Sequence, residues 1–184
     1  MKTKKTIIIC LFCCLFVTFT AQTRFYNPAS EWEQSLYDVA DRSVWPDDVR
    51  NSFEDYSDTK VAWTGIVENF SVDESFDEYN VLWLYAKHHY YDWIEDLFYS
   101  TPILLSPSGE GHFVTYWVLN KQADLTSLTE DLKDMLIIAY GTPFQISDDE
   151  DKDVYISGEY VRFIDDIYVN PNWLDYGRGG LSSY

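Results

Sequence analysis

The stretch FVTYWVLNKQADLTSLTEDLKDMLIIAYG, residues 113–141, decides the predicted fold. Its first part, 113–119, is rich in the β-branched and aromatic side chains that strands favour. Three leucines then recur at helical spacing, which predicts a short helix over 126–133. The apolar run 135–140 predicts a strand that is buried on both faces and ends at a Gly-Thr-Pro turn.

Two strands are predicted before this stretch and one after it. Residues 60–70 and 78–88 alternate between two faces and are joined by an acidic loop of hairpin length. Residues 154–164 supply a fifth strand, in which Gly158 suits a bulge or a barrel kink. The order of three strands, a helix and two strands is that of the OB-fold. We therefore expect a mainly β (α+β) chain, a five-stranded OB-like antiparallel barrel; an unspecified α+β domain with a five-stranded sheet is the alternative.

The region before the strands is predicted to be helical. Asn27-Pro28-Ala29-Ser30-Glu31 has the residues of a helix start, with the helix running to about Arg42. A second short helix begins near Trp45-Pro46, and both helices are expected to dock on the strands. The predicted segments are a signal peptide (1–21), an N-terminal helical segment (22–58), the barrel (59–170) and a C-terminal tail (171–184).

The first 21 residues have the pattern of a secretory signal peptide. Lys2, Lys4 and Lys5 precede the apolar-to-neutral run TIIICLFCCLFVTFT, which is the order of a charged n-region and an apolar h-region. This run is shorter than the roughly 20 apolar residues of a membrane span. We expect an exported chain, in the periplasm, at the outer membrane or outside the cell. An uncleaved anchor and a lipoprotein signal are the alternatives, so membrane attachment stays open.

Charge restricts the partners of the mature chain. All three cysteines lie within the signal, so no disulfide can form beyond it. Of 13 Lys and Arg, three lie in the signal, which leaves 10 against 31 Asp and Glu, a formal charge of −21. Such a surface repels phosphate backbones, which argues against nucleic acid, and it tolerates or attracts cations and basic proteins. The seven Trp and fifteen Tyr all lie beyond the signal and indicate a folded core.

Three strings resemble the strand signatures of Slp-type outer-membrane lipoproteins and other exported OB-fold proteins. They are Val61–Val67 (VAWTGIV), Gly111–Val114 (GHFV) and Leu136–Gly141 (LIIAYG), and the resemblance covers about residues 58–168. It implies an envelope role without known catalysis, and it implies no site residues. Since the chain lacks a small residue before each candidate lipobox cysteine, lipid attachment is not implied.

The segment 87–96 (KHHYYDWIED) holds the richest set of metal-ligating residue types. His88, His89 and Asp92 are candidate ligands for zinc or another transition metal. On a strand the two imidazoles point to opposite faces, whereas on a helix His88 and Asp92 share a face. The alternative is an amphipathic turn whose apolar side chains pack inward and whose acids are solvated.

Two loops are further candidates for binding. Residues 106–112 (SPSGEGH) lack the G-x-S-x-G elbow of a hydrolase nucleophile. The segment is predicted to be a loop that enters a strand. As a functional alternative it is a rim loop, in which Glu110 and His112 contact a ligand at the barrel mouth. Residues 147–153 (SDDEDKD) are densely acidic but lack the glycine of an EF-hand loop. No cofactor is expected, apart from a weakly held divalent cation at most.

Aromatic residues are spread over the predicted strands, and about half of them should point into the core. The others could form a stacking platform of the kind that OB-folds present to oligosaccharides, and we assign Trp83 and Tyr85 to it. The aromatic residues of the strands are Trp63, Tyr79, Trp83, Tyr85, Tyr116, Trp117, Tyr155 and Tyr160.

Together these features predict a noncatalytic binding or structural module of the cell envelope, with a protein or a neutral glycan as partner. The alternative is a metal-binding protein or a metal-dependent enzyme centred on His88, His89 and Asp92.

Export is tested by cell fractionation with intact-mass measurement. We expect the chain outside the cytosol, with the mass lowered by the loss of about the first 21 residues. Full-length protein among the cytoplasmic proteins would contradict export, whereas an added acyl mass would identify the lipoprotein alternative.

Overall fold

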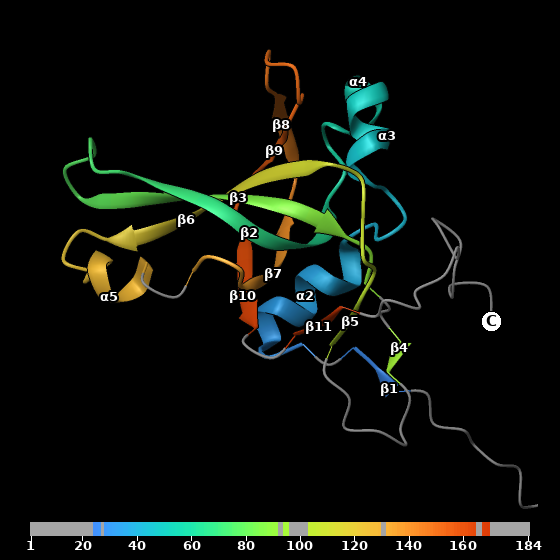
Figure 1. Ribbon diagram of the computed structural model, residues 1–184, viewed down its shortest axis with the longest axis horizontal. Helices are drawn as coiled ribbons and strands as arrows, with labels where there is room; N and C mark the ends of the chain where they lie inside the picture. The colour runs from blue at the N-terminus through green and yellow to red at the C-terminus, as the bar shows by residue number, and fades with distance from the viewer. Residues whose placement is uncertain are drawn as a thin grey trace, which may run out of the picture.

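The computed structural model describes residues 24–26, 28–91, 94–95, 103–129, 132–164 and 167–169. This part of the chain is mainly β, and its centre is a seven-stranded mixed sheet in the order β10-β7-β2-β3-β6-β9-β8 (Figure 1). The strands of this sheet are β2 (Val61–Asp73), β3 (Tyr79–His89), β6 (His112–Asn120), β7 (Leu136–Gly141), β8 (Pro143–Ile146), β9 (Val154–Ile156) and β10 (Tyr160–Ile164).

Two small sheets and four short helices complete the described part. The small sheets pair β1 (Arg24–Phe25) with β4 (Ile94–Glu95) and β11 (Ile167–Val169) with β5 (Ile103–Leu105). The helices are α2 (Glu31–Val39), α3 (Pro46–Asn51), α4 (Phe53–Tyr56) and α5 (Leu125–Thr129). Within the described residues, no helix is both long and apolar enough to cross a membrane.

The predicted order of strands and helix is confirmed at the level of single elements. β2, β3, β6, α5 and β7 occur in the predicted order, with the unpredicted strands β4 and β5 between β3 and β6. All six residues of β7 are buried, as predicted. β2 extends to Asp73, beyond the predicted end at residue 70, whereas β3 has the predicted length. The hairpin of these two strands forms a projecting arm (Figure 1).

The last strands differ from the prediction. The segment predicted as one strand over 154–164 is divided into β9 and β10, and the break contains Gly158. β8 follows β7 after the single residue Thr142 and was not predicted. The breaks lie side by side, since Ser157 donates its backbone N–H to the Thr142 carbonyl at 2.9 Å and its Oγ accepts the Thr142 N–H at 2.8 Å.

Strand pairing also corrects the antiparallel prediction. β6 and β9 are parallel, so the sheet is mixed. The other pairs in this sheet are antiparallel: β10 with β7, β7 with β2, β2 with β3, β3 with β6, and β9 with β8. The outer strands β10 and β8 do not pair with each other. A closed five-stranded barrel is therefore not confirmed, because β8 is an additional strand and the last predicted strand is divided into β9 and β10.

Both breaks depend on backbone contacts that only glycine permits. A Cβ on Gly158 would lie 1.6 Å from the carbonyl oxygen of Tyr116 in β6. A Cβ on Gly141 would lie 1.7 Å from the carbonyl oxygen of Ser157. No side chain fits at either position unless the backbone moves apart, which is the close approach that glycine serves in strands.

The first hydrophobic core lies on the inner face of the large sheet. Trp63 is its largest side chain, and the Trp63 Nε1 donates to the carbonyl of Val44 at 2.8 Å. Val49 of α3 packs here, as the predicted docking of the second helix requires. The buried members are Val44, Val49, Val61, Trp63, Val67, Leu82, Leu84, Ala86, Phe113, Leu119, Leu132, Ile137, Ala139, Val154 and Ile156.

A second core covers the outer face of β2 and β7. Ala62, Leu136 and Ile138 alternate with residues of the first core and pack against α2. β7 and the first half of β2 are therefore buried on both faces. The buried members of the second core are Tyr26, Leu36, Ala40, Ala62, Tyr91, Leu105, Leu136, Ile138 and Tyr140.

A buried carboxylate fixes α2 to this second core. Glu33 accepts hydrogen bonds from the hydroxyls of Tyr26 and Tyr140 and from the backbone N–H of Ala29, and it lies 3.5 Å from the Arg162 guanidinium. Burial raises the pKa of Tyr26 and of Tyr140, so both hydroxyls keep the protons that they donate.

The start of α2 corrects a detail of the helix prediction. Ser30 is the N-cap, and its Oγ accepts the backbone N–H of Glu33 at 3.1 Å. The predicted start included Asn27, which lies outside the described residues. The helix therefore starts later than the Asn-Pro signal predicts. The Ser30 hydroxyl stabilises this start, because it accepts a backbone N–H that has no partner within the first helical turn.

We expect Gly158→Ala to lower the free energy of unfolding by about 3 kcal/mol, because the new methyl group forces β9 away from β6. Chemical denaturation of the purified chain measures this change. Gln145→Ala, at an exposed position of neighbouring β8, is the matched control and should shift it by less than about 0.5 kcal/mol. Equal stability of the two variants would contradict the role of the contact.

Candidate functional site

Three of the four residues predicted to bind a ligand lie on one outer face. In the pairing of β3 with β6, Trp83 is opposite Tyr116, and Lys87 is opposite His112. Directly paired residues point to the same side of a sheet, and so do residues two apart on one strand. Tyr85 therefore lies between Trp83 and Lys87 on the same face as His112.

Four aromatic rings from four strands meet on this face. The Trp83 ring centroid lies 5.3 Å from that of Tyr116 and 6.1 Å from that of Tyr155. Phe144 completes the group, 6.5 Å from Tyr116 and 6.1 Å from Tyr155. All four pairs of rings meet edge to face, which is a favourable geometry for contacts between aromatic rings. We call Trp83, Tyr116, Phe144 and Tyr155 the aromatic patch.

The aromatic patch is partly exposed to solvent. Phe144 is 45% exposed, and the other three side chains have intermediate burial. This distinguishes the patch from Trp63, which is fully buried in the first core. The partly exposed rings offer both faces and edges to a ligand.

Sequence reasoning missed Phe144. It lies between the predicted Gly-Thr-Pro turn and the acidic loop 147–153, where no strand was predicted and no alternating pattern marks an outward position. In the structure a register shift between Pro143 and Gln145 interrupts the pairing of β8 with β9. Because of this bulge, Phe144 and Gln145 are both exposed. The sequence marks Phe144 only as an apolar residue directly after Thr142-Pro143.

Carboxylates lie close to one end of the aromatic patch. Burial raises the pKa of Tyr155, and nearby ionisable groups raise it further. These groups are Tyr85, Asp153 and Asp149. Asp149 is fixed in the β8–β9 loop, since its Oδ1 accepts the hydroxyl of Ser147 at 2.5 Å. The face therefore combines aromatic rings with negative charge.

Glu110, the fourth predicted ligand-binding residue, lies apart from the patch and is buried. Its Oε1 accepts the Tyr90 hydroxyl at 2.6 Å, and its Oε2 accepts the backbone N–H of Asp47 at 3.1 Å. Asp47 belongs to the first turn of α3, where a carboxylate satisfies a free N–H. Glu110 thus holds α3 against the sheet, which is a structural role.

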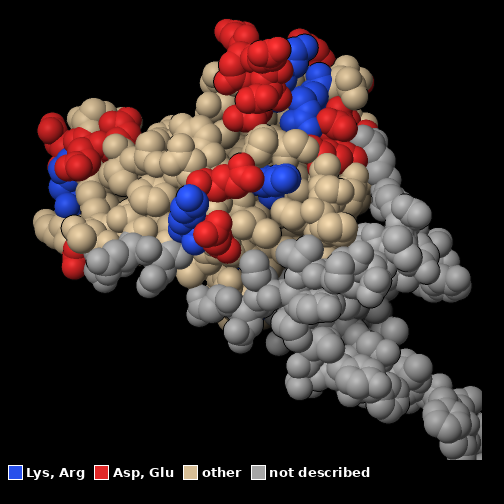
Figure 2. All heavy atoms as spheres, viewed as in Figure 1, with Lys and Arg blue, Asp and Glu red and all other residues tan. Residues whose placement is uncertain are grey.

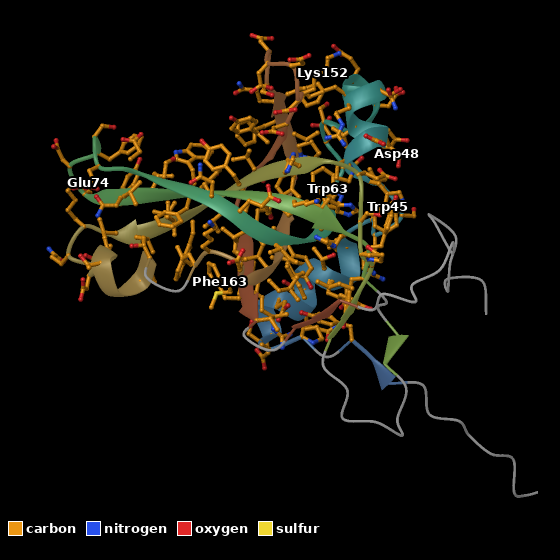
Figure 3. All side chains as sticks on the ribbon, in the orientation of Figure 1. Trp45, Asp48, Trp63, Glu74, Lys152 and Phe163 are labelled. Carbon is orange, nitrogen blue, oxygen red and sulfur yellow. The ribbon has the colours of Figure 1, made fainter. Side chains whose placement is uncertain are left out.

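The predicted metal ligands His88 and His89 are both buried near the end of β3. As neighbours in a strand they point to opposite faces. His88 Nδ1 accepts the backbone N–H of Glu110 at 3.0 Å, and the ring packs 5.7 Å from Trp45, which lies beside the end of the sheet in Figure 3. The Nδ1 of His89 bonds the carbonyl of Ser106 at 2.7 Å.

Burial gives the two imidazoles lowered pKa values. It lowers the pKa of His88 to about 3, with further contributions from His89 and Arg50, and it also lowers the pKa of His89. Both rings are therefore neutral near pH 7. With Nδ1 of His88 accepting a hydrogen bond, its proton resides on Nε2, a buried atom with no hydrogen-bond partner among the described residues.

The predicted metal centre is not assembled in the described part of the chain. There, no group of three or more His, Cys, Asp and Glu side chains could hold a metal ion. Asp92, the third predicted ligand, lies outside the described residues. The acidic segment 147–153 is largely exposed at the end of the β8–β9 hairpin, and cation binding there stays a prediction.

Comparisons with protein-family models, with curated proteins and with solved structures found no match to this chain. Any function must therefore be argued from the geometry of its own side chains.

Burial of His88 makes stability depend on pH. In the unfolded chain this imidazole has a pKa near 6.5, and in the folded chain about 3. Between these values the unfolded state binds a proton that folded His88 does not, so the free energy of unfolding falls as the pH falls, by about 1.4 kcal/mol per pH unit.

His88→Asn, which keeps an acceptor for Glu110 N–H, should lower this slope between pH 6.5 and 5 relative to the unsubstituted chain. The measurement is urea denaturation at a series of pH values. Gln145→Ala, at an exposed position of β8, is the control and should leave the slope unchanged, because it alters no titratable group. An unchanged slope in His88→Asn would contradict the buried neutral ring.

Proposed function

We propose that this protein is an exported, noncatalytic binding module of the cell envelope, built as an OB-like barrel, that contacts its partner through the aromatic patch. The partner is a protein or a neutral glycan. The observation that carries the proposal is the meeting of four partly exposed rings from β3, β6, β8 and β9 on one outer face.

Continuity of the chain across the two breaks supports the OB-like barrel. β7 and β8 are one run interrupted at Thr142, and β9 and β10 are one run interrupted at 157–159. If each run is counted as one bent strand, the pairs close a ring: the β9–β10 run pairs with β6 at one end and with β7 at the other. Five such strands, with α5 between the third and the fourth, form the connectivity of an OB-fold.

The contrast between the two outer faces supports the position of the site. The outer face of β2 and β7 is covered by α2 and the second core. On the outer face of β3, β6, β8 and β9, apolar side chains remain partly exposed, including Phe144 at 45% and Val118 at 51%. In OB-folds the face of strands two and three, here β3 and β6, is the usual binding surface.

Charge and ring chemistry support the kind of partner. The chain carries a formal charge of −18, which disfavours polyanions such as nucleic acids. Aromatic rings bind the apolar faces of sugars and the side chains of proteins by stacking and by burial of apolar area. Neither mode needs a catalytic group.

Binding through the patch is tested by co-sedimentation of the exported chain with the envelope fraction of the producing cell. We expect Trp83→Ala to weaken retention at least tenfold, because truncating a central Trp removes about 1.4 kcal/mol or more. Trp32→Ala is the matched control, since Trp32 is 57% exposed on α2, outside the patch. Equal retention of the two variants would contradict the proposal.

Treating the fraction before the experiment identifies the class of partner. Protease removes a protein partner, whereas periodate oxidation removes a glycan. Loss of retention after one treatment alone assigns the partner to that class.

A further inference from the structure

We propose that the aromatic patch, together with two acidic projections beside it, binds a basic segment of a protein partner, rich in Lys and Arg. This inference rests on the proposed function of the patch and names the chemistry of its occupant.

Acidic side chains are concentrated at the two projections. One is the tip of the β2–β3 hairpin and the other is the end of the β8–β9 hairpin. Lys152 lies in the second turn, and Lys121, which follows β6, lies beside the first. The amine of Lys121 already donates to the carbonyls of Glu74 and Phe76, at 2.7 and 2.9 Å. The acidic residues are Asp73, Glu74, Asp77, Glu78, Asp148, Asp149, Glu150, Asp151 and Asp153.

The two projections flank a surface with few charges. Figure 2 shows red side chains gathered over the β2–β3 tip and over the β8–β9 hairpin, with mostly tan surface between them. Figure 3 places Glu74 on the first projection and Lys152 on the second. The aromatic patch belongs to β3 and its neighbour β6, of which β3 starts at the first projection, and to β8 and β9, which form the second. An extended segment that crosses the patch would therefore meet negative charge at both ends.

The rings of the patch suit cationic side chains. Ammonium and guanidinium groups bind over the faces of Trp and Tyr, and the attraction is strongest at Trp. Trp83 contacts Tyr116 and Tyr155, so a guanidinium at Trp83 would touch more than one ring. Asp149 and Asp153 lie close enough to Tyr155 to act on it electrostatically. The negative charge beside the rings would strengthen the binding of a cation.

A basic segment gains most from the two features together. A neutral glycan would stack on the rings and donate hydroxyl hydrogen bonds to the carboxylates that it touches, but it would gain no ion pairing from either projection. An anionic ligand would be repelled by them. A basic segment would form cation–π contacts with the rings and ion pairs with the carboxylates of the projections. The charge of the surface therefore favours a basic segment over the other two classes of ligand.

The experiment measures fluorescence anisotropy of a labelled eight-residue peptide of alternating Arg and Ser with the purified exported chain. A matched peptide with Gln in place of each Arg is the neutral control. We expect the Arg peptide to bind at least tenfold more tightly than the Gln peptide, with an affinity that falls as salt rises.

Variants separate the ring contribution from general attraction. Trp83→Leu keeps apolar area and removes the indole face, and we expect it to weaken the Arg peptide about fivefold or more. The triple variant Asp148→Asn, Glu150→Gln and Asp151→Asn should weaken binding and reduce its salt dependence. The matched control, Glu31→Gln with Asp38→Asn on α2, changes charge outside the patch and should have a smaller effect than the loop variant.

Each outcome decides the inference. Weakening by Trp83→Leu and by the loop variant supports it. Arg-peptide binding that Trp83→Leu leaves unchanged overturns it, because the attraction is then general. Absence of Arg-peptide binding also overturns it. If envelope retention still requires Trp83 and is lost after periodate alone, the proposed function stands and only the basic partner fails.

Discussion

The structure depends on the close contact between the backbone at Gly158 and the carbonyl of Tyr116. This contact lets the chain of β9 and β10 leave β6 and turn toward β7, so that one continuous run pairs with β6 through β9 and with β7 through β10. Gly141 permits the corresponding turn between β7 and β8. Sharp bends at glycine are the usual way in which a twisted sheet acquires strong curvature.

This curvature separates an inner face from two outer faces with different roles. The inner face is filled by the first core around Trp63. The outer face of β2 and β7 is closed by α2, which Glu33 holds through hydrogen bonds to Tyr26 and Tyr140. No comparable layer covers the outer face of β3 and β6 among the described residues. The partly exposed rings on that face are therefore free of the packing constraint that a second layer would impose.

The sequence predicted what local patterns encode and missed what distant residues create. Helical spacing and apolar runs predicted α5 and β7, and Gly158 marked a kink within the last predicted strand. The parallel pairing of β6 with β9 could not be predicted, because it depends on a fold-wide turn. The burial of Glu33 was equally hidden, since its partners come from remote segments. Trp83 and Tyr85, which were predicted to belong to a stacking platform, lie partly exposed on one outer face, whereas the bulge that exposes Phe144 leaves no local pattern.

An exposed aromatic face also needs protection from a second copy of the same chain. Exposed apolar patches promote self-association unless charge opposes it. Here the acidic ends of the β2–β3 and β8–β9 hairpins flank the patch, so two copies that met face to face would bring like charges together. Pro143 lies at the start of the edge strand β8, where it limits pairing with another strand. The negative charge thus opposes self-association of the chain. It leaves the rings accessible to a partner of opposite charge.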